Sequence, residues 1–102
     1  MAEKEAAGVL GLAQKAGHAA YGDAAVREAV EKKEAVLLVI ATDVSPNTEK
    51  ELVHLAEKAN IPVIRMLTRE ALGRCLGRAP RAAAAITDKG LAALLTKKMS
   101  IE

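Results

Sequence analysis

Aromatic residues are almost absent from this chain: it has no phenylalanine and no tryptophan, and Tyr21 is its single tyrosine. Proteins that bind single-stranded nucleic acids usually stack bases on aromatic side chains, so this absence argues against that class of binder. The core must instead be built from alanine, valine, leucine and isoleucine, which requires close spacing between helices and strands.

Cysteine and long hydrophobic runs are also scarce. Cys75 is the single cysteine, so no internal disulfide can form, and Leu72 and Leu76 beside it indicate a buried, unreactive thiol. No run of about 20 apolar residues predicts a membrane span. The charged start (MAEKE) lacks the basic region and apolar core of a signal peptide. Together these features predict a cytoplasmic protein without a membrane partner.

The residue types that usually bind metals or act as nucleophiles are few and scattered. His18 and His54 are far apart, and no Cys-x-x-Cys or His-x-x-x-His spacing occurs, so we expect no metal site and no cofactor. No glycine-rich phosphate-binding motif is present either. Ser45 is followed by Pro46, which is typical of a helix cap rather than of a nucleophile. We therefore expect no catalytic residues.

The pattern of apolar residues predicts the fold class. Residues 35–41 (AVLLVIA) show no polar alternation, which is typical of a strand buried on both faces of a sheet. Helical spacing is expected over residues 3–16, 23–33, 46–59, 68–76 and 88–99, with Leu12 and Leu94 on apolar faces. Further strands are expected over residues 19–21, 61–66 and 82–86. This order predicts an α/β fold: a three-layer α/β/α sandwich with a four-stranded, largely parallel sheet and five helices, as one domain over residues 1–102.

Positive charge is concentrated in one segment. The net charge is only +2, but five of the six arginines lie between residues 65 and 81, where Glu70 is the only acidic residue. Such a local excess indicates either an anionic partner or a solvated charged face, and the sequence leaves both interpretations open.

The predicted strand-to-helix turns could bind phosphate. Free backbone amides are expected at the helix starts, which lie near Asp23, Ser45, Thr68 and Asp88. Four basic residues are expected to flank these turns: Lys15, Arg27, Arg78 and Arg81. This arrangement favours a folded RNA that is held by its backbone and shape.

Asp43 suggests a different chemistry. It follows the central strand and precedes x-x-Pro, which resembles the phosphoacceptor turn of receiver domains, and Thr87 and Lys89 extend the likeness. That chemistry needs a magnesium ion held by further acidic residues after an earlier strand, and these are missing. The alternative role for Asp43 is a hydrogen bond to the backbone of its own turn.

Several short motifs, taken in order, resemble the L7Ae/L30e family of ribosomal proteins and its small bacterial YlxQ-like branch. They are residues 10–17 (LGLAQKAG), Gly22 at a helix start, residues 38–46 (LVIATDVSP), residues 72–77 (LGRCLG) and residues 84–88 (AAITD). The resemblance implies an α/β/α sandwich and RNA binding. The typical target of the family is the kink-turn, a sharply bent duplex with sheared G·A pairs.

The resemblance also implies which residues would contact RNA. From the second helix and its turn these are Gly22, Asp23, Ala24, Ala25, Arg27 and Glu28; the central turn would add Asp43 and Val44. A loop on the flipped-out nucleotide would comprise Gly77, Arg78, Ala79, Pro80 and Arg81. The chain departs from the family pattern at Ala24-Ala25, where kink-turn binders carry Asn-Glu, and at Glu28, where they carry lysine. Alanine cannot hydrogen-bond a base edge and glutamate repels phosphate, so we expect recognition by backbone and shape.

The leading hypothesis is a non-enzymatic RNA-binding protein associated with the ribosome or translation, with ribosomal or another structured RNA as partner and no DNA. The second is a protein-interaction module that has kept the fold and lost kink-turn recognition. The third is a phosphorelay or nucleotide enzyme based on Asp43.

Overall fold

The structure, a computed structural model, describes residues 2–99. Within this range the five predicted helices and four predicted strands are all present. They are α1 (Ala2–Lys15), β1 (Ala19–Tyr21), α2 (Asp23–Glu31), β2 (Leu37–Ile40), α3 (Pro46–Ala59), β3 (Val63–Arg65), α4 (Arg69–Cys75), β4 (Ala83–Ile86) and α5 (Lys89–Met99). β1 has the predicted bounds, and the other three strands are shorter than the apolar runs that predict them.

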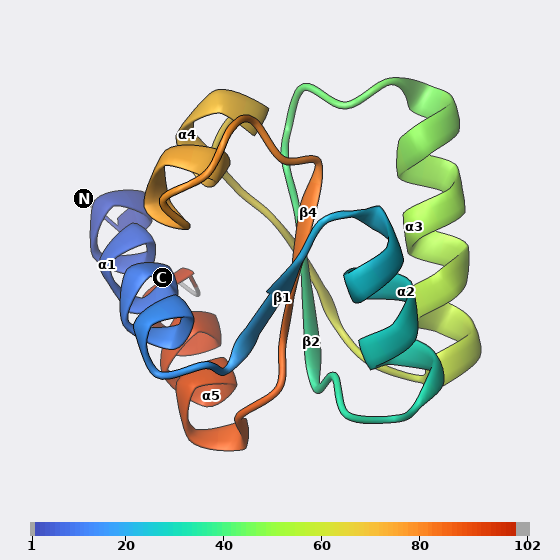
Figure 1. Cartoon of the computed structure of the whole chain (residues 1–102), viewed down its shortest axis with the longest axis horizontal. Helices are drawn as coiled ribbons and strands as arrows, with labels where there is room; N and C mark the ends of the chain where they lie inside the picture. The colour runs from blue at the N-terminus through green and yellow to red at the C-terminus, as the bar shows by residue number, and fades with distance from the viewer. Residues whose placement is uncertain (1, 100–102) are drawn as a thin grey trace.

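The sheet lies between two layers of helices: α1, α4 and α5 cover one face, and α2 and α3 cover the other (Figure 1). Alternate residues of β2 therefore enter different cores. Leu37 and Val39 pack under α1, α4 and α5, whereas Leu38 and Ile40 pack under α2 and α3. All four side chains are fully buried, which confirms the prediction that this strand is covered on both faces.

The direction of β4 corrects the predicted sheet. The strand order is β1-β4-β2-β3, and β4 runs antiparallel to both β1 and β2, so that only β2 and β3 form a parallel pair. The sheet is mixed, and the prediction of a largely parallel sheet is wrong. A parallel strand would need a connection that returns the chain to the opposite edge of the sheet. The seven-residue α4 does not return it, and the chain enters β4 at the edge where β2 ends, as the hydrogen bond from Ala41 N to Ala82 O shows (2.8 Å).

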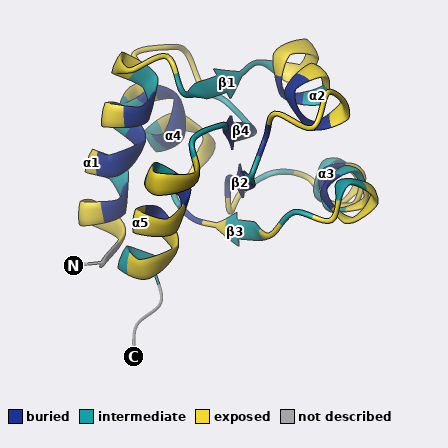
Figure 2. Cartoon of the chain, turned by 90° about the horizontal axis from the view of Figure 1, so that it is seen from below, coloured by how far each residue is buried: buried dark blue, intermediate teal, exposed yellow. Residues whose placement is uncertain are grey.

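The outer helices bury narrower stripes than expected. Leu12 is 58% exposed and Leu94 is 38% exposed, although both were expected on apolar faces. The buried stripe of α1 consists of Ala6, Val9, Leu10 and Ala13, and α5 buries Ala92 and Leu95. Both helices are exposed along their outer side (Figure 2). Leucine spacing alone fits more than one face of an outer helix, and small residues complete the buried stripe.

At three of the four expected helix starts a side chain caps the helix. The side chains of Ser45, Thr68 and Asp88 each accept a hydrogen bond from the backbone amide three residues later. At the fourth, Gly22 occupies the cap position of α2, and Asp23 is the first helical residue. As a result α2 begins without any side chain that accepts hydrogen bonds from its first amides.

Candidate nucleic-acid interface

Three segments meet at one edge of the sheet and are called the rim below: residues 22–28, residues 43–44 and residues 77–81. β1, β2 and β3 end at this edge, and β4 begins there. The first and third segments share a cavity of about 220 Å³, to which Gly22, Arg27 and Arg81 contribute. The second segment contacts the start of α4, to which the third is also hydrogen-bonded. The site residues expected from the family resemblance are therefore brought together, whereas Lys15, which was expected to flank the turns, lies outside the rim.

Lys15 and Asp88 belong to the other edge of the sheet. Lys15 ends α1, which leads into the start of β1, and Asp88 follows the end of β4. The hydrogen bond from Thr87 N to His18 O (2.9 Å) fastens these two connections to each other. The reversal of β4 moves the start of α5 away from the other strand-to-helix turns, whereas Lys15 lies at this edge because it precedes the start of β1. The predicted rim therefore loses one helix start and one flanking lysine.

The start of α2 presents backbone groups rather than base-reading side chains. Gly22 has φ of 92°, a left-handed conformation that favours glycine, and no side chain caps the helix. Ala24 and Ala25 are exposed. Glu28 pairs with Lys32 at 2.7 Å, and this hydrogen bond lowers the pKa of Glu28 and raises the pKa of Lys32. This face of α2 therefore offers amide donors and a carboxylate that is already paired.

Arg27 is less available than its position suggests. Its guanidinium lies 3.3 Å from Asp23 and 3.7 Å from Glu51 on α3. Two carboxylates thus compete with any phosphate for the same charge. The sequence could not place Glu51 there, because the pairing depends on how α2 packs beside α3.

Asp43 connects two turns of the rim edge. Its Oδ1 accepts a hydrogen bond from Arg69 N (2.8 Å), and Arg69 Nε lies 3.7 Å from the same oxygen. The expected bond within its own turn is replaced by this longer-range contact to the first residue of α4. Within residues 2–99 no group of three or more His, Cys, Asp or Glu side chains is arranged to hold a metal ion. Asp43 therefore has a clear structural role in fixing the start of α4.

The loop of residues 77–81 is pressed against α4. Gly77 has φ of 68°, and Arg78 N donates a hydrogen bond to Gly73 O (2.8 Å), which turns the chain back at the helix end. A Cβ atom on Gly73 would lie 2.2 Å from Ala79 O and 2.9 Å from Pro80 Cα. The absence of a side chain at Gly73 thus permits the close approach of the loop.

Tyr21 is the contact point of the two arginines in this loop. Arg78 Nε donates a hydrogen bond to the tyrosine hydroxyl (2.9 Å), and the Arg78 guanidinium carbon lies 5.2 Å from the ring centroid. The Arg81 guanidinium carbon lies 5.8 Å from the same centroid. The hydrogen bond from Arg78, with a smaller contribution from Gln14, lowers the pKa of Tyr21. The site prediction missed this residue, although its status as the single aromatic side chain was a usable signal.

The arginine-rich segment divides into two groups. Three of its members have carboxylate partners: Arg65 pairs with Glu49, Arg69 with Asp43 and Arg74 with Glu70. Arg78 and Arg81 have no carboxylate partner among the described residues, and both lie on Tyr21. The sequence left open whether these arginines form a solvated charged face or bind an anionic partner. The structure supports the first interpretation for Arg65, Arg69 and Arg74, which are paired, whereas Arg78 and Arg81 carry uncompensated charge that could bind an anion.

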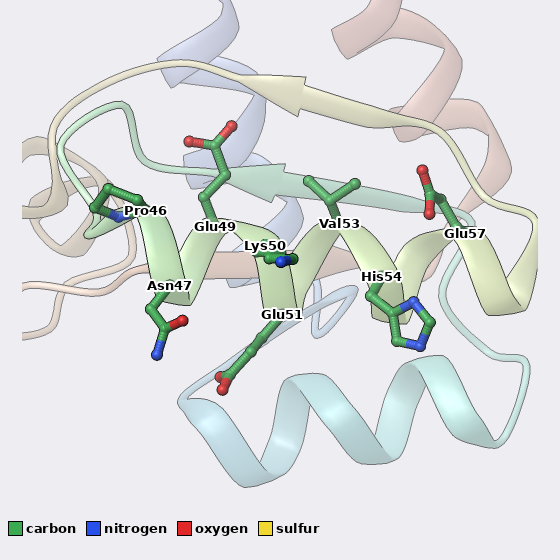
Figure 3. Close-up of a pocket in the computed structure, with 8 residues that line it drawn as sticks. All are labelled: Pro46, Asn47, Glu49, Lys50, Glu51, Val53, His54 and Glu57. Carbon is green, nitrogen blue, oxygen red and sulfur yellow. The ribbon is translucent and has the colours of Figure 1, made fainter.

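A larger hollow lies elsewhere and does not suit an anion. An open groove of about 890 Å³ follows the outer side of α3, where Glu49, Glu51 and Glu57 surround Lys50 and His54 (Figure 3). Glu49 and Glu51 already pair with Arg65 and Arg27, and Glu57 lies on the same helix as Lys50, so this groove has no excess of positive charge that would attract a phosphate backbone. Size alone therefore does not identify the functional surface, and the rim is the better candidate for binding a polyanion.

A reactive thiol and a membrane-spanning helix are two further possibilities for the described part of the chain. Cys75 is half-buried rather than buried as expected, and this burial raises the pKa of its thiol, which keeps it in the less reactive protonated form at neutral pH. Among residues 2–99, no helix combines the length and the apolar character that crossing a lipid bilayer requires.

Known proteins resemble this chain over most of its length. A family model described as "Ribosomal protein L7Ae/L30e/S12e/Gadd45 family" matches residues 4–96. The RNA-binding protein YlxQ of Bacillus subtilis (strain 168) is 31% identical over 84 residues, which make up 82% of this chain and 84% of that protein.

Solved structures share the fold. A protein with unknown function from Bacillus halodurans C superposes with a TM-score of 0.85 at 28% identity, covering 91% of this chain and 94% of that chain. The Giardia lamblia 15.5kD RNA binding protein gives a TM-score of 0.79 at 20% identity, covering 95% of this chain and 83% of that chain. The second likeness shows a shared fold, with the same mixed α/β architecture.

Proposed function

The chain belongs to the ribosomal protein L7Ae/L30e/S12e/Gadd45 family, and on this basis we propose that it is a non-enzymatic RNA-binding protein whose rim contacts the RNA. The family resemblance expected from the sequence motifs is confirmed. The observation that carries the proposal is the pair of guanidiniums without carboxylate partners, Arg78 and Arg81, beside the uncapped start of α2.

The rim suits the phosphate backbone of an RNA better than its bases. Guanidinium groups bind phosphate oxygens with two parallel hydrogen bonds, and free amides at a helix start add further donors. Ala24 and Ala25 have no side-chain groups that could hydrogen-bond a base edge. We therefore propose that the protein recognises a folded, kink-turn-like RNA by its backbone and shape, with Asp43 and Val44 adjoining the contact surface.

The family also suggests the setting. We propose that the domain acts in the cytoplasm in association with the ribosome or with translation, since ribosomal proteins give the family its name. The relatives YlxQ and the Giardia 15.5kD protein are both described as RNA-binding, which supports RNA as the partner of this chain.

A binding titration tests the proposal. The wild-type protein is titrated with ribosomal RNA, a kink-turn RNA and a scrambled duplex at several salt concentrations. We expect tighter binding to one of the two folded RNAs than to the scrambled duplex. Equal binding of all three, or no binding at low salt, would contradict the proposal.

A pair of double variants then locates the contact. Arg78→Ala with Arg81→Ala should weaken binding and reduce the slope of log K against log salt by about 1.5, the loss expected for two phosphate contacts. Arg65→Ala with Arg74→Ala removes the same charge from arginines that already have partners. This control should leave the slope close to that of the wild type.

The absence of base-reading side chains on α2 favours one other function, a protein-interaction module that has kept the fold without kink-turn recognition. Ala24 and Ala25 are exposed where kink-turn binders carry polar residues. A pull-down from cells with and without nuclease separates the two functions. Partners that survive nuclease treatment would favour the module, and loss of all partners would favour RNA binding.

A further inference from the structure

We propose that Tyr21 is a positioning residue, which holds the guanidiniums of Arg78 and Arg81 together as a preorganised pair for two phosphates of a bound RNA. The inference rests on the proposed RNA-binding function and deepens it, because it names the part of the RNA that the loop contacts and the residue that orders the contact.

The geometry places one aromatic ring under two cations. The guanidinium carbons of Arg78 and Arg81 lie 5.2 Å and 5.8 Å from the ring centroid of Tyr21, both within the range of a cation–π interaction. The hydroxyl of Tyr21 also accepts a hydrogen bond from Arg78 Nε at 2.9 Å. The two like charges are therefore held close together by the ring, although they repel each other.

This arrangement leaves the pair unneutralised. The Nε atom of Arg81 is buried and has no hydrogen-bond partner among the described residues, and neither arginine pairs with a carboxylate there. A carboxylate in the position of Tyr21 would fix the arginines equally well but would cancel their charge. An aromatic ring orders them and leaves their outer hydrogen-bond donors available for phosphate.

The position of Tyr21 in the fold explains why it can do this. It is the last residue of β1 and pairs with Ala84 at the beginning of β4, the strand into which the arginine loop leads. It also directly precedes Gly22 at the uncapped start of α2. Tyr21 therefore lies between residues 22–28 and residues 77–81 of the rim, and its backbone is fixed by pairing within the sheet.

Holding Arg78 and Arg81 in place before binding should increase the affinity of the protein for RNA. Arginine side chains lose much rotational freedom when they bind, and a partner that fixes them beforehand reduces that loss. Tyr21→Leu keeps the net charge but removes the ring and the hydroxyl, and we expect it to weaken RNA binding about tenfold. Tyr21→Phe keeps the ring and loses only the hydroxyl, so its effect should lie between those of the wild type and Tyr21→Leu.

A double-mutant cycle separates positioning from any other role of Tyr21. RNA affinity is measured by fluorescence anisotropy of a labelled kink-turn RNA for the wild type, Tyr21→Leu, the Arg78→Ala/Arg81→Ala variant and the triple variant. If Tyr21 acts through the arginines, Tyr21→Leu weakens binding in the wild type and has almost no effect in the arginine-free background. Thermal unfolding of each variant confirms that it is folded at the binding temperature.

Other results would overturn the inference in distinguishable ways. An equal loss of affinity in both backgrounds would mean that Tyr21 contacts the RNA itself or supports the fold. No loss in either background, with wild-type binding intact, would leave RNA binding in place and refute the positioning role. No binding by the wild-type protein to any folded RNA would refute the proposed function and, with it, this inference.

Discussion

Gly73 provides the sharpest test of how the arginine loop is held. It lies in α4 under the loop, and the Cβ atom of an alanine there would lie 2.2 Å from Ala79 O, 2.7 Å from Ala79 C and 2.9 Å from Pro80 Cα. All three are backbone atoms, so no side-chain rotation can relieve the overlap. Gly73→Ala should therefore displace the whole loop rather than a single side chain.

The expected cost follows from the contacts that the displacement affects. Overpacking of this kind costs about 1–3 kcal/mol. Displacement of the loop would also weaken the hydrogen bonds from Arg78 N to Gly73 O and from Arg81 N to Arg69 O, each of which contributes about 1 kcal/mol to stability. Alanine regains about 1 kcal/mol of helix propensity. The net loss of unfolding free energy should be about 2 kcal/mol, which corresponds to a fall in Tm of roughly 10 °C for a chain of this size.

Gly8→Ala is the matched control. Gly8 is exposed in α1, and no atom lies within 4 Å of the position that its Cβ would take. The same chemical change should therefore raise the unfolding free energy by about 0.5–1 kcal/mol.

Thermal unfolding and RNA titration of the two variants give the answer. Gly73→Ala should be less stable than the wild type and should bind RNA more weakly, because its loop carries the unpaired arginines. Gly8→Ala should be at least as stable as the wild type, with unchanged affinity. If Gly73→Ala matched Gly8→Ala in stability, the close packing of the loop on α4 would be refuted.

Three further predictions concern single side chains. Ultraviolet absorbance titration should show a pKa for Tyr21 below the ordinary tyrosine value, and Arg78→Ala should raise that pKa. A lowered pKa stabilises the folded protein fully only above the ordinary pKa of tyrosine, and this stabilisation is lost as the pH falls through the lowered value. The unfolding free energy at neutral pH should therefore not depend on this titration. Asp43→Ala should lower the unfolding free energy by about 1 kcal/mol, because the first amide of α4 loses its acceptor, and acetyl phosphate with magnesium should leave the mass of the wild-type protein unchanged. Cys75 should react with a thiol reagent more slowly in the folded protein than in urea, and equal rates would contradict its burial.

The sequence was sufficient to predict the elements of the fold because each carries a local signal. The apolar run of β2, the caps Ser45 and Thr68, and the left-handed Asn60 at the end of α3 are all properties of adjacent residues. Even the alanine-rich β4 could be located, since Pro80 and the cap at Asp88 bound it on either side.

The direction of β4 could not be predicted in the same way. Periodicity shows that a segment is a strand and which faces are buried, but it contains no information on whether the chain crosses the sheet before the strand begins. Assuming a crossover through α4 placed Asp88 beside the other turns. The structure places Asp88 at the opposite edge, because the chain enters β4 at the edge where β2 ends.

The partners of the charged side chains could not be predicted from the sequence either. Arg69 and Asp43 are 26 residues apart, and Arg78 and Tyr21 are 57 residues apart, so their contacts follow from the fold rather than from local sequence. The composition pointed to the arginine-rich segment, but it identified Tyr21 only as the single aromatic residue and not as part of the site. The contact of Arg78 and Arg81 with Tyr21 could be found only from the structure.

RNA binding at the rim can be followed residue by residue in backbone amide NMR spectra of the labelled protein, recorded during titration with a kink-turn RNA. We expect shift changes at residues 22–28, 43–44 and 77–81, and little change along the outer side of α3, where carboxylates line the groove. Changes centred on α3 or on the α1–α5 side, with the rim unaffected, would contradict RNA binding at the rim.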